Sequence, residues 1–317
     1  MAWHNAPSLT KLTSAQHAGK RGAHLWGVDP KGTLYSTFQQ TPGGEWSNWM
    51  GPDWAGPGFP KQVYELAACQ GKAGNVTLFT LDMMRRLKCI TQDDPNGNWT
   101  GWQGLDWNGA DGMLTKLTAV QRGIKELGAE IWALTNSGEV FSSHQWLPEA
   151  RWFQGWYQWR TPQDSQMIEL AAARQHNELI ALWGIDSNLR LWCMTENSAD
   201  NHTPPSGWGA WEGPNWQNAP RLRNIAAVRG AEGVILWGIT EQLQIIQNWQ
   251  NGKGIWNGWS HVNWLGAPHC YEITAAGQNN HCSQLWGVTV MGKVTSIAQA
   301  APACNWGPWS DKDDQPK

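Results

Sequence analysis

One short phrase, an aliphatic residue followed by an aromatic residue and often by Gly, returns six times along the 317 residues. We call its aromatic residue the anchor, and the six anchors are Trp26, Phe79, Trp132, Trp183, Trp237 and Trp286. Successive anchors are 53, 53, 51, 54 and 49 residues apart. A period of this length is typical of repeat proteins, in which each unit buries its apolar surface against its neighbours. The repeats predict one domain over residues 1–317, with units 1–53, 54–106, 107–162, 163–215, 216–263 and 264–317.

The pattern inside each unit is that of short β-strands. In the first unit, candidate strands lie near Leu12–Gln16, Ala23–Val28, Thr33–Gln39 and Glu45–Met50. Turn sequences separate them, such as Asp29-Pro30-Lys31-Gly32 between the second and third strands. The 35 Gly and 17 Pro residues interrupt the chain too often for long helices. We therefore predict an all-β fold, a six-bladed β-propeller with four antiparallel strands per blade.

A second repeated motif is Trp-x-x-Trp, which occurs once in every unit and uses many of the 26 Trp residues. The pairs are Trp46/Trp49, Trp99/Trp102, Trp156/Trp159, Trp208/Trp211, Trp256/Trp259 and Trp306/Trp309. Residues three apart on a strand point to opposite faces of its sheet, and a blade between two other blades covers both faces. We expect one Trp of each pair to pack between blades. The other Trp either packs as well or lines a groove that binds a ligand.

A third Trp lies five residues after the pair in four units, at the link into the next blade. These are Trp54, Trp107, Trp216 and Trp264, each preceded by an acidic or amide residue, namely Asp53, Asp106, Asn215 or Asn263; Trp3 matches the same point of the repeat. Loops lie on the surface, so a large ring there needs a partner. Two roles stay open for this link Trp. It either caps the blade edge or forms a shelf for a sugar ring, with the preceding side chain binding hydroxyl groups.

A Gln or Glu residue stands thirteen residues after each anchor. The series is Gln39, Gln92, Gln145, Glu196, Gln250 and Gln299. Such a side chain either holds a turn by a hydrogen bond to the backbone or offers an amide to a ligand. We predict a sugar contact for Gln39, Gln92 and Gln250 and leave the turn-holding role open for the series.

Composition excludes several classes of protein. The net charge of −3 gives no basic surface for nucleic acid. No apolar run approaches the ~20 residues of a membrane span. Residues 1–11 lack the apolar segment of a signal peptide, so we expect synthesis in the cytoplasm, with release by a non-Sec route left open. The six Cys residues are too sparse for a disulfide scaffold and are expected to be buried thiols.

No motif for chemistry appears among these repeats. The nine His residues fall at no common place in the units, and no metal-ligand spacing, nucleophile motif or phosphate-binding loop is present. An active site is one place, whereas this chain presents similar places six times. We therefore predict a protein that is not an enzyme and needs no metal or cofactor. Repeated weak sites suit multivalent binding, in which avidity exceeds the affinity of a single site.

The blade phrase resembles a known family. The string from Leu25 to Tyr35, followed by the string from Gln40 to Trp49, is similar to the blades of tectonin-type and PLL-like β-propeller lectins. The resemblance implies carbohydrate sites in grooves between adjacent blades, for fucose, galactose, N-acetylglucosamine or O-methylated sugars. Two features depart from it. PLL-like lectins commonly have seven blades, and their outer strand often ends in Leu-Gly-Gly, where this chain has Gly51-Pro52-Asp53-Trp54.

Together these patterns predict a multivalent lectin that binds glycans by stacking on Trp and by hydrogen bonds. The candidate sugar-binding residues are Trp3, Gln39, Trp46, Trp49, Asp53, Trp54, Gln92, Trp99, Trp102, Asp106, Trp107, Trp208, Trp211, Asn215, Trp216, Gln250, Trp256, Trp259, Asn263 and Trp264. The alternative is a protein-interaction scaffold whose Trp residues are wholly structural. The sequence allows either a monomer or a homodimer.

Overall fold

The computed structural model describes sixteen stretches of the chain. They are residues 5–17, 21–51, 54, 56, 58–71, 74–93, 98–105, 113–122, 127–146, 151–152, 155–162, 165–198, 207–260, 263–278, 281–301 and 305–310. Within these stretches, no helix has the length and apolar character needed to cross a membrane.

Six antiparallel sheets follow one another along the chain, and we number them as blades 1 to 6. Blade 1 holds β1 (Lys11–Gln16), β2 (Ala23–Val28) and β3 (Leu34–Phe38). Blade 2 holds β4 (Val63–Gln70), β5 (Val76–Asp82), β6 (Leu87–Thr91) and β7 (Gln103–Gly104). Blade 3 holds β8 (Leu114–Gln121), β9 (Leu127–Thr135), β10 (Val140–Trp146), β11 (Arg151–Trp152) and β12 (Tyr157–Trp159).

The second half of the chain repeats this plan with three strands per blade. Blade 4 holds β13 (Met167–Arg174), β14 (Ile180–Asp186) and β15 (Leu191–Thr195). Blade 5 holds β16 (Leu222–Arg229), β17 (Val234–Thr240) and β18 (Ile245–Trp249). Blade 6 holds β19 (Cys270–Gly277), β20 (Ser283–Thr289) and β21 (Val294–Ala298). Two short 3₁₀ turns, η2 (Trp216–Asn218) and η3 (Trp264–Gly266), lie on the links into blades 5 and 6.

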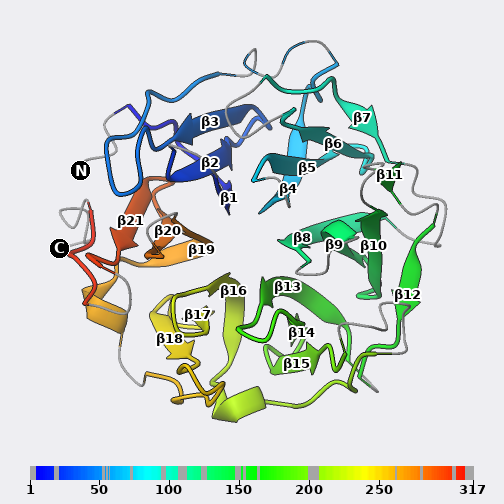
Figure 1. Ribbon diagram of the computed structural model, residues 1–317, viewed down its shortest axis with the longest axis vertical. Helices are drawn as coiled ribbons and strands as arrows, with labels where there is room; N and C mark the ends of the chain where they lie inside the picture. Colours follow the sequence, from blue (N-terminus) through cyan, green and yellow to red (C-terminus); the bar gives the residue numbers. More distant parts are fainter. Residues whose placement is uncertain are drawn as a thin grey trace.

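The blades form a closed ring around a central axis (Figure 1). The first strand of each blade lies innermost, and these strands contact one another in the cycle β1, β4, β8, β13, β16, β19 and back to β1. The ring closes by packing of blade 1 on blade 6. Leu9 N–H donates to Gly292 O at 2.9 Å, and the Tyr271 hydroxyl donates to Leu9 O at 2.8 Å. Among the described residues, β1 pairs with β2 and adds no strand to blade 6.

The middle strand of each blade forms the core, because it is covered by sheets on both sides. Every anchor is fully buried there, including Phe79 in blade 2. The Gly that often follows the anchor also has a packing reason. A Cβ on Gly27 would lie 2.3 Å from Leu9 Cδ1, and one on Gly287 would lie 2.6 Å from Cys270 Sγ. Glycine at these positions makes room for the side chain that enters at the start of the innermost strand.

The fourth strand is less regular than predicted. Blades 2 and 3 carry extra outer strands, but in blades 1, 4, 5 and 6 the outer segment is joined to the sheet by isolated bridges such as Gln39 to Trp46 and Gln250 to Trp256. Side-chain hydroxyls interrupt the ladder there. Ser47 Oγ accepts from Phe38 N–H at 3.2 Å, and Ser260 Oγ accepts from Gln247 N–H at 3.0 Å. The prediction of four regular strands in every blade is therefore wrong, although the outer segment keeps its place.

Candidate functional site

The first Trp of each pair packs its blade against the preceding one. The anchor of one blade meets this Trp of the next blade edge to face, as Trp26–Trp99 at 6.1 Å, Trp132–Trp208 at 5.9 Å, Trp183–Trp256 at 6.0 Å, Trp237–Trp306 at 5.6 Å and Trp286–Trp46 at 5.7 Å between ring centroids. Edge-to-face aromatic pairs stabilise beyond the area they bury. The last contact joins blade 6 to blade 1, so the aromatic contacts run through the ring closure.

Blade 3 departs from the predicted motif. Trp152, rather than Trp156, pairs with Gln145 and lies edge to face with Phe79 at 5.2 Å. Trp159 keeps the second place of the pair and is buried. In blade 3 the structural pair is therefore Trp152 and Trp159, which are seven residues apart, and Trp156 lies half-buried against the core between blades 2 and 3.

The second Trp of each pair is also largely a packing residue. Trp259 and Trp309 are buried, and Trp102 lies half-buried with its ring 5.8 Å from Phe59. Trp49 is half-buried and packs against the core between blades 6 and 1. Trp211 is half-buried and donates its indole N–H to Arg160 O at 2.9 Å. Trp49, Trp102 and Trp211 keep part of their surface exposed.

The link Trp caps the blade edge where the structure describes it. Trp216 is 7% exposed and lies 4.8 Å from Trp256, and Trp264 is 8% exposed and lies 4.9 Å from Trp306. Trp54 meets Trp99 in the same way, at 5.2 Å. The open shelf is therefore corrected for Trp216 and Trp264, since their faces are covered by the next blade.

The side chains before the link Trp hold the link itself. Asn263 Oδ1 accepts from Ile245 N–H at 3.1 Å, and its Nδ2 donates to Ala267 O at 2.7 Å. Asn215 adopts a left-handed backbone conformation, with φ of 60°, which Asn tolerates better than most residues. Trp3, Asp53, Asp106 and Trp107 lie outside the described residues.

The Gln series holds the turns at the blade edges. In five blades its side-chain oxygen accepts from the backbone N–H at the start of the middle strand, as Ala23–Gln39, Val76–Gln92, Ile180–Glu196, Val234–Gln250 and Ser283–Gln299 at 2.8–3.4 Å. The exposed fractions of Gln39, Gln92 and Gln250 are 3%, 2% and 6%. This geometry gives all three residues the turn-holding role, because their oxygens are occupied and their surface is buried, and the sugar contact stays a prediction.

In three blades the same side chain, Gln39, Glu196 or Gln250, also reaches the preceding blade, and we call this inter-blade contact the latch. Two residues of the preceding blade take part in the latch. One follows its innermost strand and is called the latch residue, and the other lies near the start of its middle strand. Between blades 6 and 1, Gln278 donates to Gln284 at 2.8 Å, and Gln39 donates to Gln284 at 3.3 Å. Between blades 4 and 5, Gln250 donates to Gln175 at 3.3 Å.

Charge replaces amides in the latch between blades 3 and 4. The guanidinium of Arg122 contacts the carboxylates of Glu130 and Glu196, and each of the three side chains is only 1% exposed. One cation here serves two buried carboxylates. Burial, with the charge of Glu196 acting in the same direction, raises the pKa of Glu130 to about 7 although Arg122 opposes the shift.

Between blades 1 and 2 an imidazole fills the equivalent space. His24 stacks on Trp26 at 3.8 Å and shares a 2.6 Å hydrogen bond with Ser36. Burial lowers the pKa of His24 well below its ordinary value, so the ring is neutral near pH 7. Between blades 2 and 3 the latch residue is Gly71, and the space next to it is taken by Asn75 Oδ1, which a Cβ on Gly71 would meet at 2.3 Å.

The interface between blades 5 and 6 also has Gly as its latch residue, Gly230, and the side chain nearest to it is that of Ile235, whose Cδ1 a Cβ on Gly230 would meet at 3.0 Å. A cavity of about 240 Å³ opens there. Its lining consists of Gly230, Ala231, Glu232, Gly233, Ile235, Gln247, Trp249, Gln250, Gln299 and Trp306. Close packing fixes the turn beside it, since a Cβ on Gly233 would lie 2.7 Å from Gln250 Cβ. We call this cavity the 5/6 groove.

The 5/6 groove combines aromatic surface with amide groups. Trp249 is 42% exposed and is the one Trp among the exposed large hydrophobic side chains of the described residues. Trp306 is half-buried on the opposite blade, and Gln247 and Gln299 lie in the same lining; because Gln299 Oε1 accepts from Ser283 N–H, Gln299 offers its side-chain N–H groups there. A concave site of apolar rings with a few polar groups suits a small neutral ligand. Trp249 is a residue that the repeat pattern did not select, because it lies outside the repeated Trp positions.

Comparison with known proteins identifies the fold. No protein-family model matches the sequence, and no curated protein matches it. Solved structures do share its architecture. A lectin of the fungus Aleuria aurantia, described as a six-bladed β-propeller with a fucose recognition mode, is 12% identical with a TM-score of 0.66, over 96% of this chain and 97% of that one.

Two further structures agree. AofleA from Arthrobotrys oligospora is 13% identical, with a TM-score of 0.64 over 98% of this chain and 91% of the other. The lectin BP39L from Burkholderia pseudomallei is 18% identical, with a TM-score of 0.60 over 95% and 83%. At these identities the likeness is one of fold. This chain therefore has the fold of six-bladed β-propellers.

Proposed function

We propose that this protein is a carbohydrate-binding propeller, a lectin, and that the 5/6 groove is a sugar site. The observation that carries the proposal is the meeting of two indole rings and several amides in one open cavity between blades. A sugar has an apolar C–H face, which stacks on an indole, and a rim of hydroxyl groups, which bind amides. Both kinds of partner are present in the 5/6 groove.

The solved structures of the same fold support the class of ligand. Three of them are described as fucose-specific or as complexes with a methyl fucoside or a fucosylated disaccharide. A 6-deoxy sugar has a methyl group in addition to its C–H face, and this suits a groove lined by Trp249, Trp306 and Ile235. Fucose is accordingly the first sugar to test on this chain.

We further propose that the six interfaces bind sugar unequally. Polar side chains fill the latch space between blades 1 and 2, 3 and 4, and 6 and 1, whereas a cavity lined by Gly230 and Ile235 lies between blades 5 and 6. Multivalency would then come from a few dissimilar sites, or from association of chains, rather than from six equal sites. The tectonin-type resemblance of the blade phrase stays a prediction about subtype.

A glycan array followed by a titration tests the proposal. The wild-type chain is expected to bind a subset of glycans, and the best of these is then titrated against Trp249→Thr. Thr is the residue that blades 2 and 4 carry at this position, as Thr91 and Thr195, so the variant is expected to fold. Loss of one stacking ring, worth about 1 kcal/mol, weakens binding by about five- to tenfold.

Met291→Ala is the matched control. Met291 is also an exposed apolar side chain, at 70%, and lies at the tip of the β20–β21 turn, at the far end of the strands from the 5/6 groove. It is expected to bind like the wild type. A blank array with no change of Trp fluorescence on sugar addition would reject the lectin and favour the interaction scaffold. Binding that is equal in Trp249→Thr and wild type would reject the 5/6 groove as its site.

A further inference from the structure

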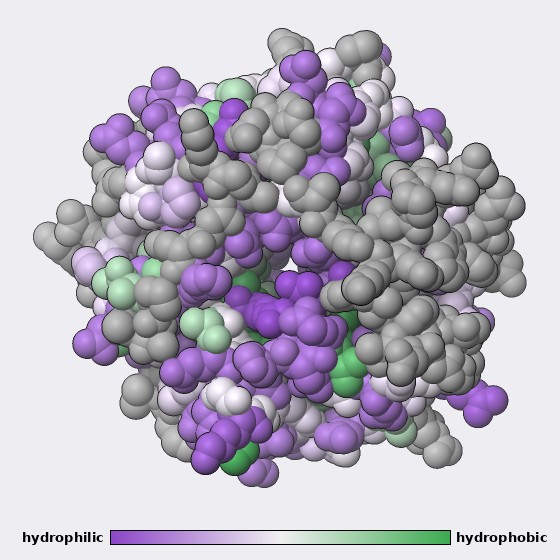
Figure 2. Space-filling view, viewed as in Figure 1, coloured by the Kyte–Doolittle hydropathy of each residue, from purple (hydrophilic) through white to green (hydrophobic). Residues whose placement is uncertain are grey.

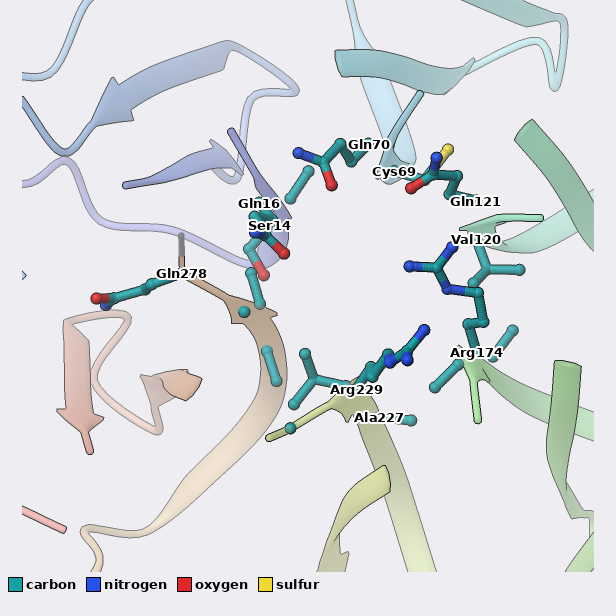
Figure 3. A pocket seen from close by; sticks show the side chains of 18 of the residues that line it. Ser14, Gln16, Cys69, Gln70, Val120, Gln121, Arg174, Ala227, Arg229 and Gln278 are labelled. Atoms are coloured by element: carbon teal, nitrogen blue, oxygen red, sulfur yellow. The ribbon is translucent and has the colours of Figure 1, made fainter. Parts of the chain in front are cut away.

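The central channel opens into a cavity of about 590 Å³ at one end. The last residue of each innermost strand is part of its lining. These six residues are Gln16, Gln70, Gln121, Arg174, Arg229 and Gly277. Figure 3 shows the long side chains among them extending into the opening. Figure 2 shows hydrophilic side chains around the central opening of the ring. We call this cavity the channel mouth.

Blades 4 and 5 make the channel mouth asymmetric. Blades 1, 2 and 3 place neutral Gln at this position, but the two adjacent blades place Arg174 and Arg229 there. Both guanidinium groups extend into the opening in Figure 3. Burial and the neighbouring charge of Arg229 lower the pKa of Arg174, and Glu178 opposes the shift. Two cations are therefore held close together in a partly desolvated space.

One carboxylate serves both cations. Glu178 Oε2 lies 3.2 Å from Arg174 Nη1, and Glu178 Oε1 lies 2.6 Å from Arg229 Nη1. The Glu178 side chain is 46% exposed, whereas the two Arg side chains are 26% and 30% exposed. Each guanidinium has five N–H donors, so one shared carboxylate uses a minority of them. The cluster keeps one net positive charge and donors that face the cavity.

The other end of the channel has the opposite character. At the beginning of the innermost strands one residue per blade forms a ring of Lys11, Glu65, Lys116, Glu169, Asn224 and Glu272. Neighbours in the ring are paired, as Lys11 with Glu65 at 3.4 Å and Lys116 with Glu169 at 2.7 Å. The other five residues of the ring, all except Lys11, line a cavity of only about 90 Å³. With three carboxylates and two ammonium groups, this end does not attract an anion.

We propose that the channel mouth binds a small molecule through an oxyanion, a carboxylate or a phosphate, held between Arg174 and Arg229. The two forked guanidinium groups match the geometry of such an anion. The anion takes the place of the Glu178 carboxylate, which is the more exposed member of the cluster. The amides of Gln70 and Gln121 face the same space and contact the uncharged part of the ligand (Figure 3).

Calorimetric titration at fixed ionic strength tests this site, with inorganic phosphate and glucuronate as probes. The test variant is Arg174→Gln with Arg229→Gln, which gives blades 4 and 5 the residue of blades 1 to 3. Arg221→Gln removes one exposed Arg on another part of the surface and serves as the control for the loss of a positive charge away from the channel mouth. Wild type and Arg221→Gln are expected to bind at least one probe, and the double variant at least about tenfold more weakly.

Two further variants sharpen the result. Glu178→Gln removes the internal competitor and is expected to strengthen anion binding, so weaker binding in this variant would overturn the exchange with Glu178. Trp249→Thr is expected to bind the probes like the wild type, which separates this site from the 5/6 groove. The proposal fails if neither probe binds the wild type, or if the double variant binds as tightly. Preference between phosphate and glucuronate identifies the kind of oxyanion.

Discussion

Replacement of Arg122 by Gln is expected to destabilise the protein by about 3–5 kcal/mol at pH 7–8. Arg122 is the cation that contacts both Glu130 and Glu196 in the latch between blades 3 and 4, and all three side chains are 1% exposed. Without Arg122, the two carboxylates are buried with neither water nor a cation beside them. The cost of keeping that charge away from water sets the size of the expected loss of stability. Unfolding in urea, followed by Trp fluorescence, measures the change.

The chain itself offers the control. At the same three positions, the latch between blades 6 and 1 holds Gln278, Gln284 and Gln39, which are joined by hydrogen bonds of 2.8 and 3.3 Å. The triple variant Arg122→Gln, Glu130→Gln, Glu196→Gln copies that neutral latch. Its free energy of unfolding is expected to lie within about 1–2 kcal/mol of the wild type, because replacing a whole buried ion cluster is often neutral.

The pH dependence follows from Glu130, whose pKa rises from 4.5 to about 7 on folding. Between these values the folded state binds a proton that the unfolded state does not, so stability falls as pH rises from 4.5 to 7. At about 1.4 kcal/mol per pH unit, this carboxyl costs on the order of 3 kcal/mol above pH 7 and nothing below 4.5. The triple variant is expected to lose this slope, and the loss caused by Arg122→Gln is expected to shrink at pH 5. A triple variant as unstable as the single one, or a single-variant loss that is equal at pH 5 and pH 8, would refute the reasoning.

Three further predictions concern packing and the 5/6 groove. Trp237→Ala, at a fully buried anchor, is expected to cost about 3–5 kcal/mol in urea unfolding, whereas Trp249→Ala costs less than about 1 kcal/mol; similar losses would contradict the assignment of core and groove. Gly233→Ala is expected to cost about 1–3 kcal/mol, since its Cβ meets Gln250 Cβ at 2.7 Å and Gln250 O at 3.0 Å. Gly230→Gln copies the latch residue of blades 4 and 6 and is expected to extend into the 5/6 groove and weaken sugar binding by about tenfold or more. Its Cβ would lie 3.0 Å from Ile235 Cδ1, so a loss of stability of about 1 kcal/mol is expected as well, and undiminished binding would contradict the role of Gly230.

Much of the architecture was predictable because it depends on residues repeated at fixed spacing. The anchors predicted six units, and each middle strand lies where its anchor predicts. The turn-holding role of the Gln series was also among the readings of the sequence, and Gln39 and Gln92 show it. These features follow from local pattern, since each unit folds by the same contacts.

The 5/6 groove was not predicted, because it depends on what one interface lacks. Gly230 stands where other blades carry Gln175, Arg122 or Gln278, and Trp249 stands where they carry smaller side chains such as Thr195. The residues that recur in every unit are those that pack between blades, so a site that depends on one unusual interface does not show in the repeat. Alignment of the six units by the residue after the innermost strand marks two glycines, Gly71 and Gly230, and the structure shows that Asn75 fills the space beside Gly71.

Location of a bound sugar tests the central claim most directly. Crystals of the chain soaked with fucose, or with the best glycan from the array, report where the ligand lies. Sugar density is expected in the 5/6 groove, with one C–H face on Trp249 or Trp306 and hydroxyls at the amides of Gln247 and Gln299. Density at other interfaces with an empty 5/6 groove at saturating ligand would contradict it.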